Sequence, residues 1–508
     1  MNNVLGYLEN SCNKYSSKTA VIEEEKSITY DELLSYSKSV GSFFATQEIF
    51  NKPIVIFMDK GIDTLISFFG VVYASNYYTL INPEFPKERI KNIIDVLKPE
   101  YVITNDIYLD YAKDNFKDIK IFNINNLKNN KINEDSLLFS KEKHISTNPL
   151  YINFTSGSTG VPKGVVISHK SVIDFIDNFT RIFDFNNKDI IANQAPFDFD
   201  VSVKDIYSAI CVGATLVIVP KSYFSSPAKL LDYLCLNNVT TLTWAVSALC
   251  LITTFHGLDY KVPDKVNKIL FSGEVMPVKH LNKWMEKLPN TTFVNLYGPT
   301  EITCNCTYYI IDKNKTYEKI PIGKTFPNEK VFLLDKDNKL VNDINKAGEI
   351  CVSGDCLALG YYNNIEQTEK HFMQNPLQND YLETIYKTGD LAYYNEDLDL
   401  VFNGRVDFQI KYQGHRIELE EIDRAITNFD EVERACSIFL EEKSKLYAFY
   451  VGDIDKKELH SKLKEKLPIF MIPTKLIKID EFPITKNGKI DRKKLLEMEE
   501  EKWLIIIK

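Results

Sequence analysis

The chain has 508 residues, of which 44% are hydrophobic and 26% charged, and its formal net charge is −9. This length exceeds what one hydrophobic core supports, so we expect two or three subdomains of a soluble globular enzyme. The acidic balance argues against nucleic acid as a main partner. No apolar stretch approaches the roughly 20 residues that cross a bilayer, and the N-terminus lacks the pattern of a signal peptide, so we expect no membrane insertion.

The nine cysteines are scattered along the chain. An odd, irregularly spaced set does not indicate a disulfide framework, so we expect the protein in a reducing cytoplasm. Cys304 and Cys306 are separated by one residue, which is a weak metal-binding signal, and two packed thiols are the favoured interpretation.

Strands and helices alternate through the first part of the chain. Thr29 and Glu32 are spaced as a capping box that opens a helix running to about Ala45. Apolar runs and periodic patterns then predict a strand at 53–58, a helix at 62–74, a strand at 78–81, a helix at 87–97 and a strand at 101–104. This alternation predicts right-handed βαβ units on a mainly parallel sheet. Residues 125–148, rich in Asn and Lys, are expected to be a solvated connector.

A glycine-rich turn follows at Thr155–Gly164, between two short apolar strands at 151–154 and 165–167. Its glycines allow successive N–H groups to point into one concavity, while its hydroxyls and Lys163 add donors and positive charge. This composition suits a polyphosphate, although the Walker A pattern cannot be aligned here. An ordinary Gly/Ser hairpin turn is the alternative on the residues alone.

Two acidic residues farther along the chain also have two interpretations. Asp200 stands in an apolar segment, where it either caps a helix at 201–210 or meets a cation, because a buried carboxylate needs a partner. Glu301 follows a tight turn, where it is either a surface residue or a magnesium ligand beside phosphate oxygens.

Five motifs then occur in one order: TSGSTGVPKG (155–164), NLYGPTE (295–301), YKTGDLA (386–392), GRVDFQIKYQGHRIELEEI (404–422) and NGKIDR (487–492). Together they resemble the acyl-adenylate-forming, ATP-dependent AMP-binding superfamily over nearly the whole chain. Within it the chain looks most like D-alanine–D-alanyl carrier protein ligases, followed by stand-alone amino-acid adenylation domains of non-ribosomal peptide synthetases. The resemblance implies a large α/β N-terminal domain built of sheet subdomains with flanking helices, and a small α+β C-terminal lid.

The resemblance also implies cofactors and site residues. ATP and Mg²⁺ would be the cofactors, with Lys489 as the catalytic lysine near the α-phosphate and Glu301 with Thr300 organising the metal. Asp390 would accept hydrogen bonds from the ribose hydroxyls, and Arg405 would approach the ribose from the far side. The other ATP-binding residues implied are Thr155, Ser156, Gly157, Ser158, Thr159, Gly160, Lys163, Gly273, Glu274, Asn295, Tyr297 and Gly298.

The motifs imply boundaries of 1–405 for the large domain, 406–408 for a hinge and 409–508 for the mobile small domain. Asp407 matches the family hinge, and the Lys411–Gly414 loop would serve the thioester step after domain rotation. In the small domain, residues 419–426 read as a helix, 435–440 and 446–451 as strands, and 459–467 as a second helix ended by Pro468.

The substrate is the least defined part. In amino-acid-activating relatives the position of Asp200 pairs with the α-ammonium group, which favours an amino acid. The implied pocket residues are Asp200, Val201, Lys204, Trp244, Leu270, Ser272, Leu296, Cys304 and Asn305. D-alanine ligases commonly carry cysteine in place of Ser272 and an apolar residue in place of Lys204. Lys204 therefore either meets an acidic substrate side chain, or points to solvent or to Asp205.

The expected activity is ATP-dependent activation of a small amino acid as an aminoacyl-adenylate, followed by transfer to the phosphopantetheine thiol of a carrier protein. That carrier is expected to be a separate protein, because fewer than about 20 residues follow Lys489. The alternatives are an adenylation enzyme of a peptide natural-product pathway for another amino acid, such as an acidic one; an acid–CoA ligase; and a nucleotide-binding regulatory protein that has lost turnover.

Overall fold

The computed structural model describes residues 1–157, 161–440, 443–484 and 490–507. The chain divides into two compact units. The first contains Met1–Pro83, Leu97–Asn153 and Gly164–Val406; the second contains Glu84–Val96, Phe154–Lys163 and Asp407–Lys508. The expected hinge at 406–408 stays a prediction, and two short segments from early in the chain belong to the second unit.

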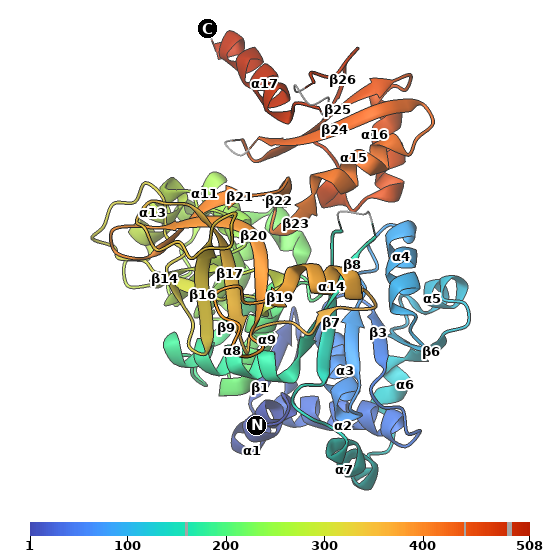
Figure 1. Cartoon of the computed structure of the whole chain (residues 1–508). Helices are drawn as coiled ribbons and strands as arrows, with labels where there is room; N and C mark the ends of the chain where they lie inside the picture. The colour runs from blue at the N-terminus through green and yellow to red at the C-terminus, as the bar shows by residue number, and fades with distance from the viewer. Residues whose placement is uncertain (158–160, 441–442, 485–489, 508) are drawn as a thin grey trace. The chain divides into compact units, whose positions relative to one another are not determined.

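The first unit contains a nine-stranded sheet (Figure 1), and several predicted site residues lie on its strands or follow them directly in the chain. Its six central strands, β1, β10, β9, β11, β12 and β13, are parallel to one another, which confirms the predicted parallel pairing, while the outer pairs β1–β2 and β13–β14 are antiparallel. In spatial order the strands are β15 (Lys324–Thr325), β14 (Thr307–Ile310), β13 (Thr292–Tyr297), β12 (Lys268–Ser272), β11 (Thr241–Ala245), β9 (Ile190–Asn193), β10 (Thr215–Ile218), β1 (Thr19–Glu23) and β2 (Lys26–Thr29).

A seven-stranded sheet and a five-stranded sheet complete the strands of this unit. The seven-stranded order is β18 (Gly360–Tyr361), β8 (Lys163–Ser168), β7 (Pro149–Thr155), β4 (Tyr77–Leu80), β3 (Pro53–Phe57), β5 (Tyr101–Thr104) and β6 (Lys120–Asn123). The five-stranded sheet contains β16 (Glu329–Leu334), β17 (Gly348–Gly354), β20 (Thr384–Tyr394), β19 (Phe372–Gln374) and β21 (Leu400–Arg405).

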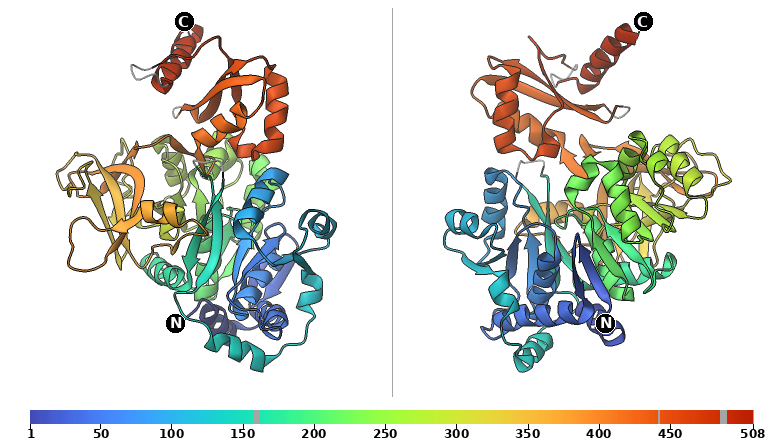
Figure 2. Two further views of the ribbon diagram at one scale, coloured as in Figure 1. Left: turned by 45° about the vertical axis from the view of Figure 1, so that its right-hand side comes forward. Right: turned by 180° about the vertical axis from the view of Figure 1, so that it is seen from behind.

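The largest core of the unit joins the two larger sheets. Its buried side chains come from strands of both sheets and from helices α1 (Leu5–Tyr15), α2 (Tyr30–Ala45), α3 (Ile62–Tyr73), α8 (His169–Ile182) and α9 (Val201–Val212). Figure 2 shows the backbone of these blue and green helices and strands from two further sides. A second core covers the other face of the nine-stranded sheet, with α10 (Pro227–Leu236), α11 (Val246–Thr254), α12 (Gly257–Tyr260) and α13 (Val278–Lys287).

Several local predictions are confirmed. Thr29 caps α2, and Glu32 completes the capping box. The helix at 87–97 and the strand at 101–104 have the predicted bounds, as α4 and β5. The connector prediction for 125–148 is wrong in part, because this stretch contains α6 (Ile124–Lys128) and α7 (Glu134–Glu142). The asparagines Asn123 and Asn133 cap these helices, and Leu127 and Leu137 bury one side of each.

The C-terminal part of the second unit is an α+β fold around its own core. It has a hairpin of β22 (Gln409–Tyr412) and β23 (His415–Glu418), and a sheet of β24 (Val432–Leu440), β25 (Lys445–Gly452) and β26 (Lys475–Lys478). The helices are α15 (Leu419–Thr427), α16 (Lys456–Lys466) and α17 (Arg492–Ile507). The first two confirm the predicted helices, and β24 and β25 confirm the predicted strands.

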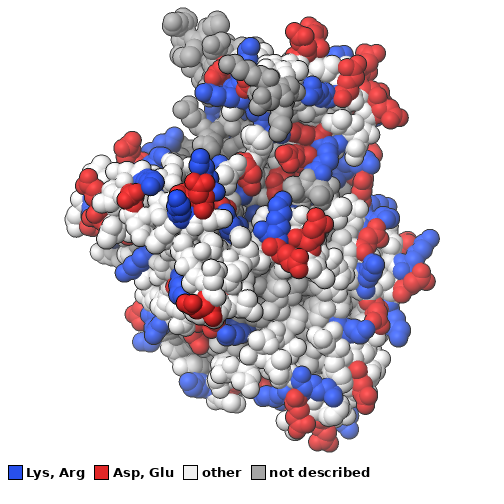
Figure 3. All heavy atoms as spheres, in the orientation of Figure 1, with Lys and Arg blue, Asp and Glu red and all other residues white. Residues whose placement is uncertain are grey.

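The remaining helical segments are short. They are α5 (Leu109–Asn115), α14 (Ile365–His371) and the 3₁₀ turns η1 (Lys221–Ser225), η2 (Thr300–Ile302) and η4 (Ile469–Met471). Within the described ranges no helix is both long and apolar enough to cross a membrane. On the face shown in Figure 3, acidic and basic side chains are interspersed.

Candidate active site

Several predicted site residues of the first unit lie at or after the carboxyl ends of adjacent parallel strands. Asp200 comes after β9, Ser272 and Gly273 come at the end of β12, and Glu301 comes after β13. Since β9, β11, β12 and β13 are neighbours, these ends lie along one edge of the sheet. In open α/β sheets this edge is where ligands bind.

Asp390 is the centre of a buried polar cluster beside β13. The Tyr297 hydroxyl donates to its carboxylate across 2.5 Å, and the Arg405 guanidinium pairs with its other oxygen. Asp390 is 1% exposed, and the short β20–β21 pairing places it directly opposite Arg405. Burial and the Asp390 charge hold the pKa of Tyr297 well above its ordinary value, so its hydroxyl stays a donor.

Glu301 lies in η2 and is 1% exposed, so the surface interpretation of this residue is wrong. The hydroxyl of Tyr361 donates to its Oε1 across 2.7 Å. Thr300 is buried beside it. The two residues that follow η2, Thr303 and Cys304, both have left-handed backbone angles (φ 56° and 82°), a costly conformation that concentrates at functional sites.

The interpretation of Asp200 as a helix cap is not supported by its contacts. Asp200 occupies the residue before α9 but makes no side-chain hydrogen bond to the first turn. Its charge instead acts on two buried groups, the Tyr151 hydroxyl and the Cys304 thiol, and contributes to raising both pKa values after the larger effect of burial. The carboxylate therefore lies near the predicted pocket residue Cys304.

Lys204 is fully buried and does not point to solvent. Its ammonium nitrogen lies 2.9 Å from Ser272 Oγ and 3.4 Å from Asn305 Oδ1, and the Cys304 thiol donates to the same Asn305 oxygen. The neighbouring carboxyl of Asp205 is also buried, and burial raises its pKa to about 8 against the opposing effect of Lys204. The hydrogen-bond partners of the buried ammonium group are thus neutral.

The structure brings four of the predicted pocket residues into direct contact: Lys204, Ser272, Cys304 and Asn305. Leu270 and Leu296 belong to the same core as Cys304, and Val201 begins α9. Trp244 is the exception. Its side chain packs in the second core, and its indole N–H donates to the Ala192 carbonyl across 2.8 Å, so it does not join the other pocket residues.

Among the predicted adenine-site residues, Asn295 and Tyr297 are buried, and the Asn295 amide donates to the Pro321 carbonyl across 2.8 Å. Gly273 has φ 94°, which glycine adopts most readily. Gly298 permits a close approach, because a Cβ there would lie 2.6 Å from both Asn305 Cα and Cys304 O.

The second unit holds the described part of the glycine-rich turn. The Ser156 hydroxyl donates to the Arg416 carbonyl across 2.8 Å, and a Cβ at Gly157 would lie 2.1 Å from the Val161 carbonyl oxygen. Thr155 and Lys163 are partly buried at the two ends of the turn. In the same unit, Asp407 accepts from the Gln409 N–H, and Lys411 and Gly414 lie on the β22–β23 hairpin. Ser158, Thr159, Gly160 and Lys489 lie outside the described residues.

Lys60 is a further cation near the predicted site residues, and the sequence alone did not indicate it. Its ammonium group donates to Asn193 Oδ1 and to the Gln194 carbonyl, each across 3.0 Å, and so contacts the turn that leads to Asp200. A lysine after an apolar strand is too common for its sequence position to have indicated this role.

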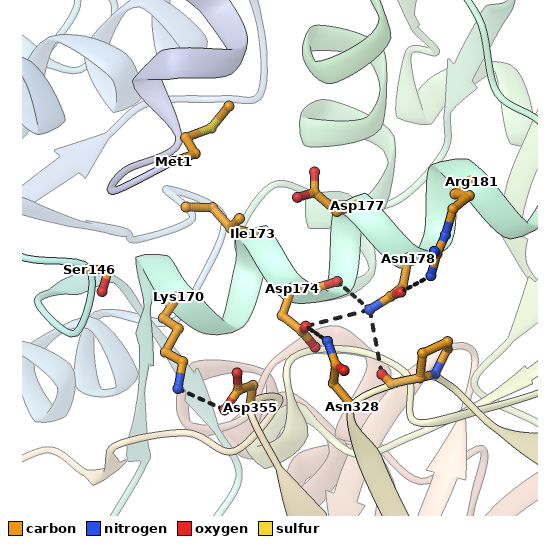
Figure 4. Close-up of a pocket in the computed structure, with 11 residues that line it drawn as sticks. Met1, Ser146, Lys170, Ile173, Asp174, Asp177, Asn178, Arg181, Asn328 and Asp355 are labelled. Carbon is orange, nitrogen blue, oxygen red and sulfur yellow. Dashed lines mark hydrogen bonds and ion pairs between the residues drawn. The ribbon is translucent and has the colours of Figure 1, made fainter.

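A surface hollow of about 630 Å³ lies beside α8, away from the predicted pocket residues (Figure 4). Its polar side chains engage one another: Lys170 pairs with Asp355 at 2.7 Å, and Asn328 donates to Asp174 across 2.6 Å. It contains none of the predicted site residues, and we place no substrate there.

Comparisons with known proteins agree with this arrangement. Residues 8–362 match the family described as "AMP-binding enzyme". The chain is 32% identical to Zwittermicin A synthase ZmaJ of Bacillus cereus over 505 residues, covering 96% of this chain and 93% of that protein. It is also 32% identical to Gramicidin S synthase 1 of Brevibacillus brevis, of which it spans only 44%.

A solved structure shares the fold. The adenylation domain AlmE of Vibrio cholerae, in complex with glycyl-adenosine-5′-phosphate, superimposes with a TM-score of 0.86 at 20% identity, covering 98% of each chain. The ordered motifs, the buried clusters at one sheet edge and the family match agree, and the chain belongs to the family of AMP-binding enzymes.

Proposed function

We propose that this chain activates a small amino acid with ATP and transfers it to the phosphopantetheine thiol of a carrier protein. The observation that carries the proposal is Asp200, a carboxylate that does not cap its own helix and whose charge acts on the buried Tyr151 and Cys304. A carboxylate in this position suits the α-ammonium group of an amino acid, because a charged partner offsets the cost of its partial burial.

The proposed reaction has two steps. A carboxylate oxygen of the amino acid attacks the α-phosphorus of ATP, the bond to pyrophosphate breaks, and an aminoacyl-adenylate forms. The thiol sulfur then attacks the acyl carbon, and AMP leaves. Lys489 would stabilise the charge that develops at the phosphate in the first step. Asp407, Lys411 and Gly414 would serve the rotation and the thioester step.

Asp390 would hold the ribose of the nucleotide. Its two hydrogen-bonding partners, Tyr297 and Arg405, fix the carboxylate in one orientation. A carboxylate has about four acceptor positions, so these two bonds leave positions for the ribose hydroxyls. Asn295 and Gly273 would line the adenine site, and the turn at Thr155–Gly164 would bind the β- and γ-phosphates.

Glu301, with Thr300 beside it, would hold Mg²⁺. No group of three or more His, Cys, Asp and Glu residues in the described ranges could hold a metal ion by itself. One buried carboxylate fits the usual arrangement in which Mg²⁺ takes its other ligands from water and substrate phosphates. When bound there, the ion would neutralise phosphate charge. Tyr361 keeps the Glu301 carboxylate in place through its hydroxyl.

Lys204 favours an acidic amino acid as a second candidate substrate over D-alanine. A buried ammonium group whose hydrogen-bonding partners are a hydroxyl and an amide oxygen gains from a carboxylate brought by the substrate. D-alanine brings no second charge, so its methyl group would face this cation.

Amino-acid-dependent ATP–pyrophosphate exchange tests these assignments, with both enantiomers of every standard amino acid and β-alanine. Exchange with glutamate or aspartate, lost in Lys204→Met, would support the acidic substrate and a peptide-pathway role. Exchange with D-alanine alone would show that Lys204 does not contribute to substrate selection. If no amino acid supports exchange, amino-acid activation is contradicted, and an acid–CoA ligase or a nucleotide-binding regulatory protein is favoured.

A further inference from the structure

Lys60 lies in the loop between β3 and α3, far in sequence from every motif of the family. Its ammonium nitrogen donates to oxygens of three consecutive residues: Asn193 Oδ1 at 3.0 Å, Gln194 O at 3.0 Å and Ala195 O at 3.4 Å. An ammonium group has three N–H donors, so the three acceptors match its full capacity. We propose that Lys60 is a positioning residue that holds the turn from Asn193 to Phe199 and thereby fixes Asp200 for substrate binding.

The turn needs such an anchor because it leaves the sheet. β9 ends at Asn193 and α9 begins at Val201, so the residues between them have no strand partners. Inside the turn the Phe199 N–H donates to the Pro196 carbonyl at 3.2 Å, and at its end the Ser202 N–H and hydroxyl donate to the Phe199 carbonyl at 3.0 and 2.7 Å. The Gln194 side chain adds one tie to the sheet by accepting from the Ala245 N–H. Lys60 alone donates hydrogen bonds to three consecutive residues at the start of the turn, Asn193, Gln194 and Ala195.

Asn193 extends the same anchor into α9. Its amide oxygen accepts from Lys60, while its amide nitrogen donates to Asp205 Oδ2 across 2.8 Å. Asp205 lies on α9, five residues after Asp200, and is fully buried. Lys60 therefore contacts the start of the turn directly and is linked to α9 through Asn193. Asp200 lies in the chain between these two anchored segments, Asn193–Ala195 and Asp205.

The charges around Lys60 indicate what a substitution would do. Burial lowers the pKa of Lys60 to about 7, and the carboxyl groups of Asp205 and Asp198 oppose this shift from a distance. All three hydrogen-bond acceptors are neutral oxygens. An ammonium group in such surroundings carries a desolvation cost, which a methionine of similar length would not. Lys60→Met is therefore expected to fold.

The first test is independent of activity. Amide hydrogen exchange would be compared in the wild type, Lys60→Met, Lys60→Arg and the control Lys52→Met. Lys52 precedes the same strand but forms a surface ion pair with Glu100. We expect the amides of residues 194–200 to exchange at least about tenfold faster in Lys60→Met than in the wild type, because local opening sets the exchange rate. The control Lys52→Met should exchange at the wild-type rate there. Unchanged protection of these amides in Lys60→Met would overturn the proposal, as would loss of protection spread over the whole sheet.

The second test rests on the proposed function and uses pairs of acids that differ only in the α-amine: D-alanine against propionate, and L-glutamate against glutarate. Lys60→Met should lower kcat/KM for the amino acid by up to about a hundredfold, through KM, with little change for the amine-free acid. Lys60→Arg should restore most of the loss. Equal losses on both members of a pair would overturn the positioning role.

A double-substitution cycle separates positioning from general damage. In an Asp200→Asn background, Lys60→Met should lower kcat/KM for the amino acid little further, because the carboxylate that Lys60 positions is already absent. Fully additive losses would contradict the proposal. If the wild type activates no amino acid, the proposed function fails, while the hydrogen-exchange result still decides whether Lys60 holds the turn.

Discussion

The ammonium nitrogen of Lys204 lies 2.9 Å from the hydroxyl oxygen of Ser272, and both side chains are buried in the first unit. This pair sets the polarity of the proposed pocket. Lys204→Met should abolish exchange with glutamate or aspartate, by at least about a hundredfold, because the substrate carboxylate would lose its charged partner. The thermal midpoint should stay the same or rise, since removing a buried charge removes a desolvation cost.

Lys170→Met is the matched control for this substitution. Lys170 forms a surface ion pair with Asp355 and should leave both exchange and stability close to wild type. Retained acidic-substrate activity in Lys204→Met would contradict the role given to Lys204.

Tyr361 and Glu301 are joined by a buried hydrogen bond of 2.7 Å. Tyr361→Phe should cost about 1–3 kcal/mol of unfolding free energy, because it removes one donor from a buried carboxylate. It should also change the Mg²⁺ concentration that gives half-maximal exchange, while the KM for the amino acid stays close to wild type. Denaturant unfolding and a Mg²⁺ titration measure the two effects. If Tyr361→Phe lowers the stability but leaves the Mg²⁺ requirement unaltered, the assignment of Glu301 as a Mg²⁺ ligand is contradicted.

Gly298→Ala should disturb the left-handed segment at Thr303–Cys304. The new methyl group would lie 2.6 Å from Asn305 Cα and Cys304 O, so the backbone must move. We expect a loss of about 1–3 kcal/mol in unfolding free energy and a higher KM for the amino acid. Gly6→Ala is the control, since the three atoms nearest to its methyl group would all belong to the flexible side chain of Met1. Wild-type kinetics in Gly298→Ala would show that the segment tolerates displacement.

The pH dependence of stability should report on Asp205. Burial raises its pKa to about 8, whereas in the unfolded chain it titrates near 4. Between these values the folded state binds the extra proton, so Asp205 lowers stability as pH rises, by up to about 1.4 kcal/mol for each pH unit. Lys60, with its pKa lowered to about 7, acts in the opposite direction only above that pH.

Asp205→Asn keeps an oxygen that can accept from Asn193 but cannot ionise. Relative to wild type, this variant should gain stability steadily as pH is raised from about 5 to 7. Asp110→Asn, at a side chain that is 98% exposed, should show no such trend. Parallel stability curves for wild type and Asp205→Asn would mean that Asp205 is ionised in the folded protein.

Lys489→Ala should bind ATP but lose adenylation, by about two to three orders of magnitude, because the lost charge acts on the transition state. Lys493→Ala, on α17, is the control. Binding measured by calorimetry beside pyrophosphate exchange separates the two effects. Unchanged exchange in Lys489→Ala would remove this residue from the catalytic step.

Local signals in the sequence predicted the fold well where capping and periodicity were strong. The Thr29–Glu32 spacing predicted the start of α2, and the apolar pattern of 87–97 predicted α4. The two helices at 124–142 were missed because each buries few side chains, so their amphipathic pattern is weak and only the capping asparagines indicated them.

The site could be predicted only in part for a different reason. The motifs give residue types in order, but they do not give the side of a strand on which a large side chain packs. Trp244 and Leu270 lie on neighbouring strands, yet they belong to different cores. The contact of Lys60 with the Asn193–Ala195 turn joins segments more than 130 residues apart, and no local pattern encodes such a pairing.

Leu270, Leu296 and Cys304 line the proposed pocket and are also members of the core that joins the two larger sheets. Substitutions that change substrate choice at these positions therefore also change the stability of the fold. Replacing a leucine here by alanine would enlarge the pocket but leave a cavity in the core, and would lower the free energy of unfolding by about 2–5 kcal/mol. Asp200 and Val201, which are only partly buried, do not carry this coupling to the same degree. A library for altered amino-acid specificity gains most by varying Val201 first, with Asp200 kept for the α-ammonium group, and by adding stabilising substitutions elsewhere before the core positions are changed.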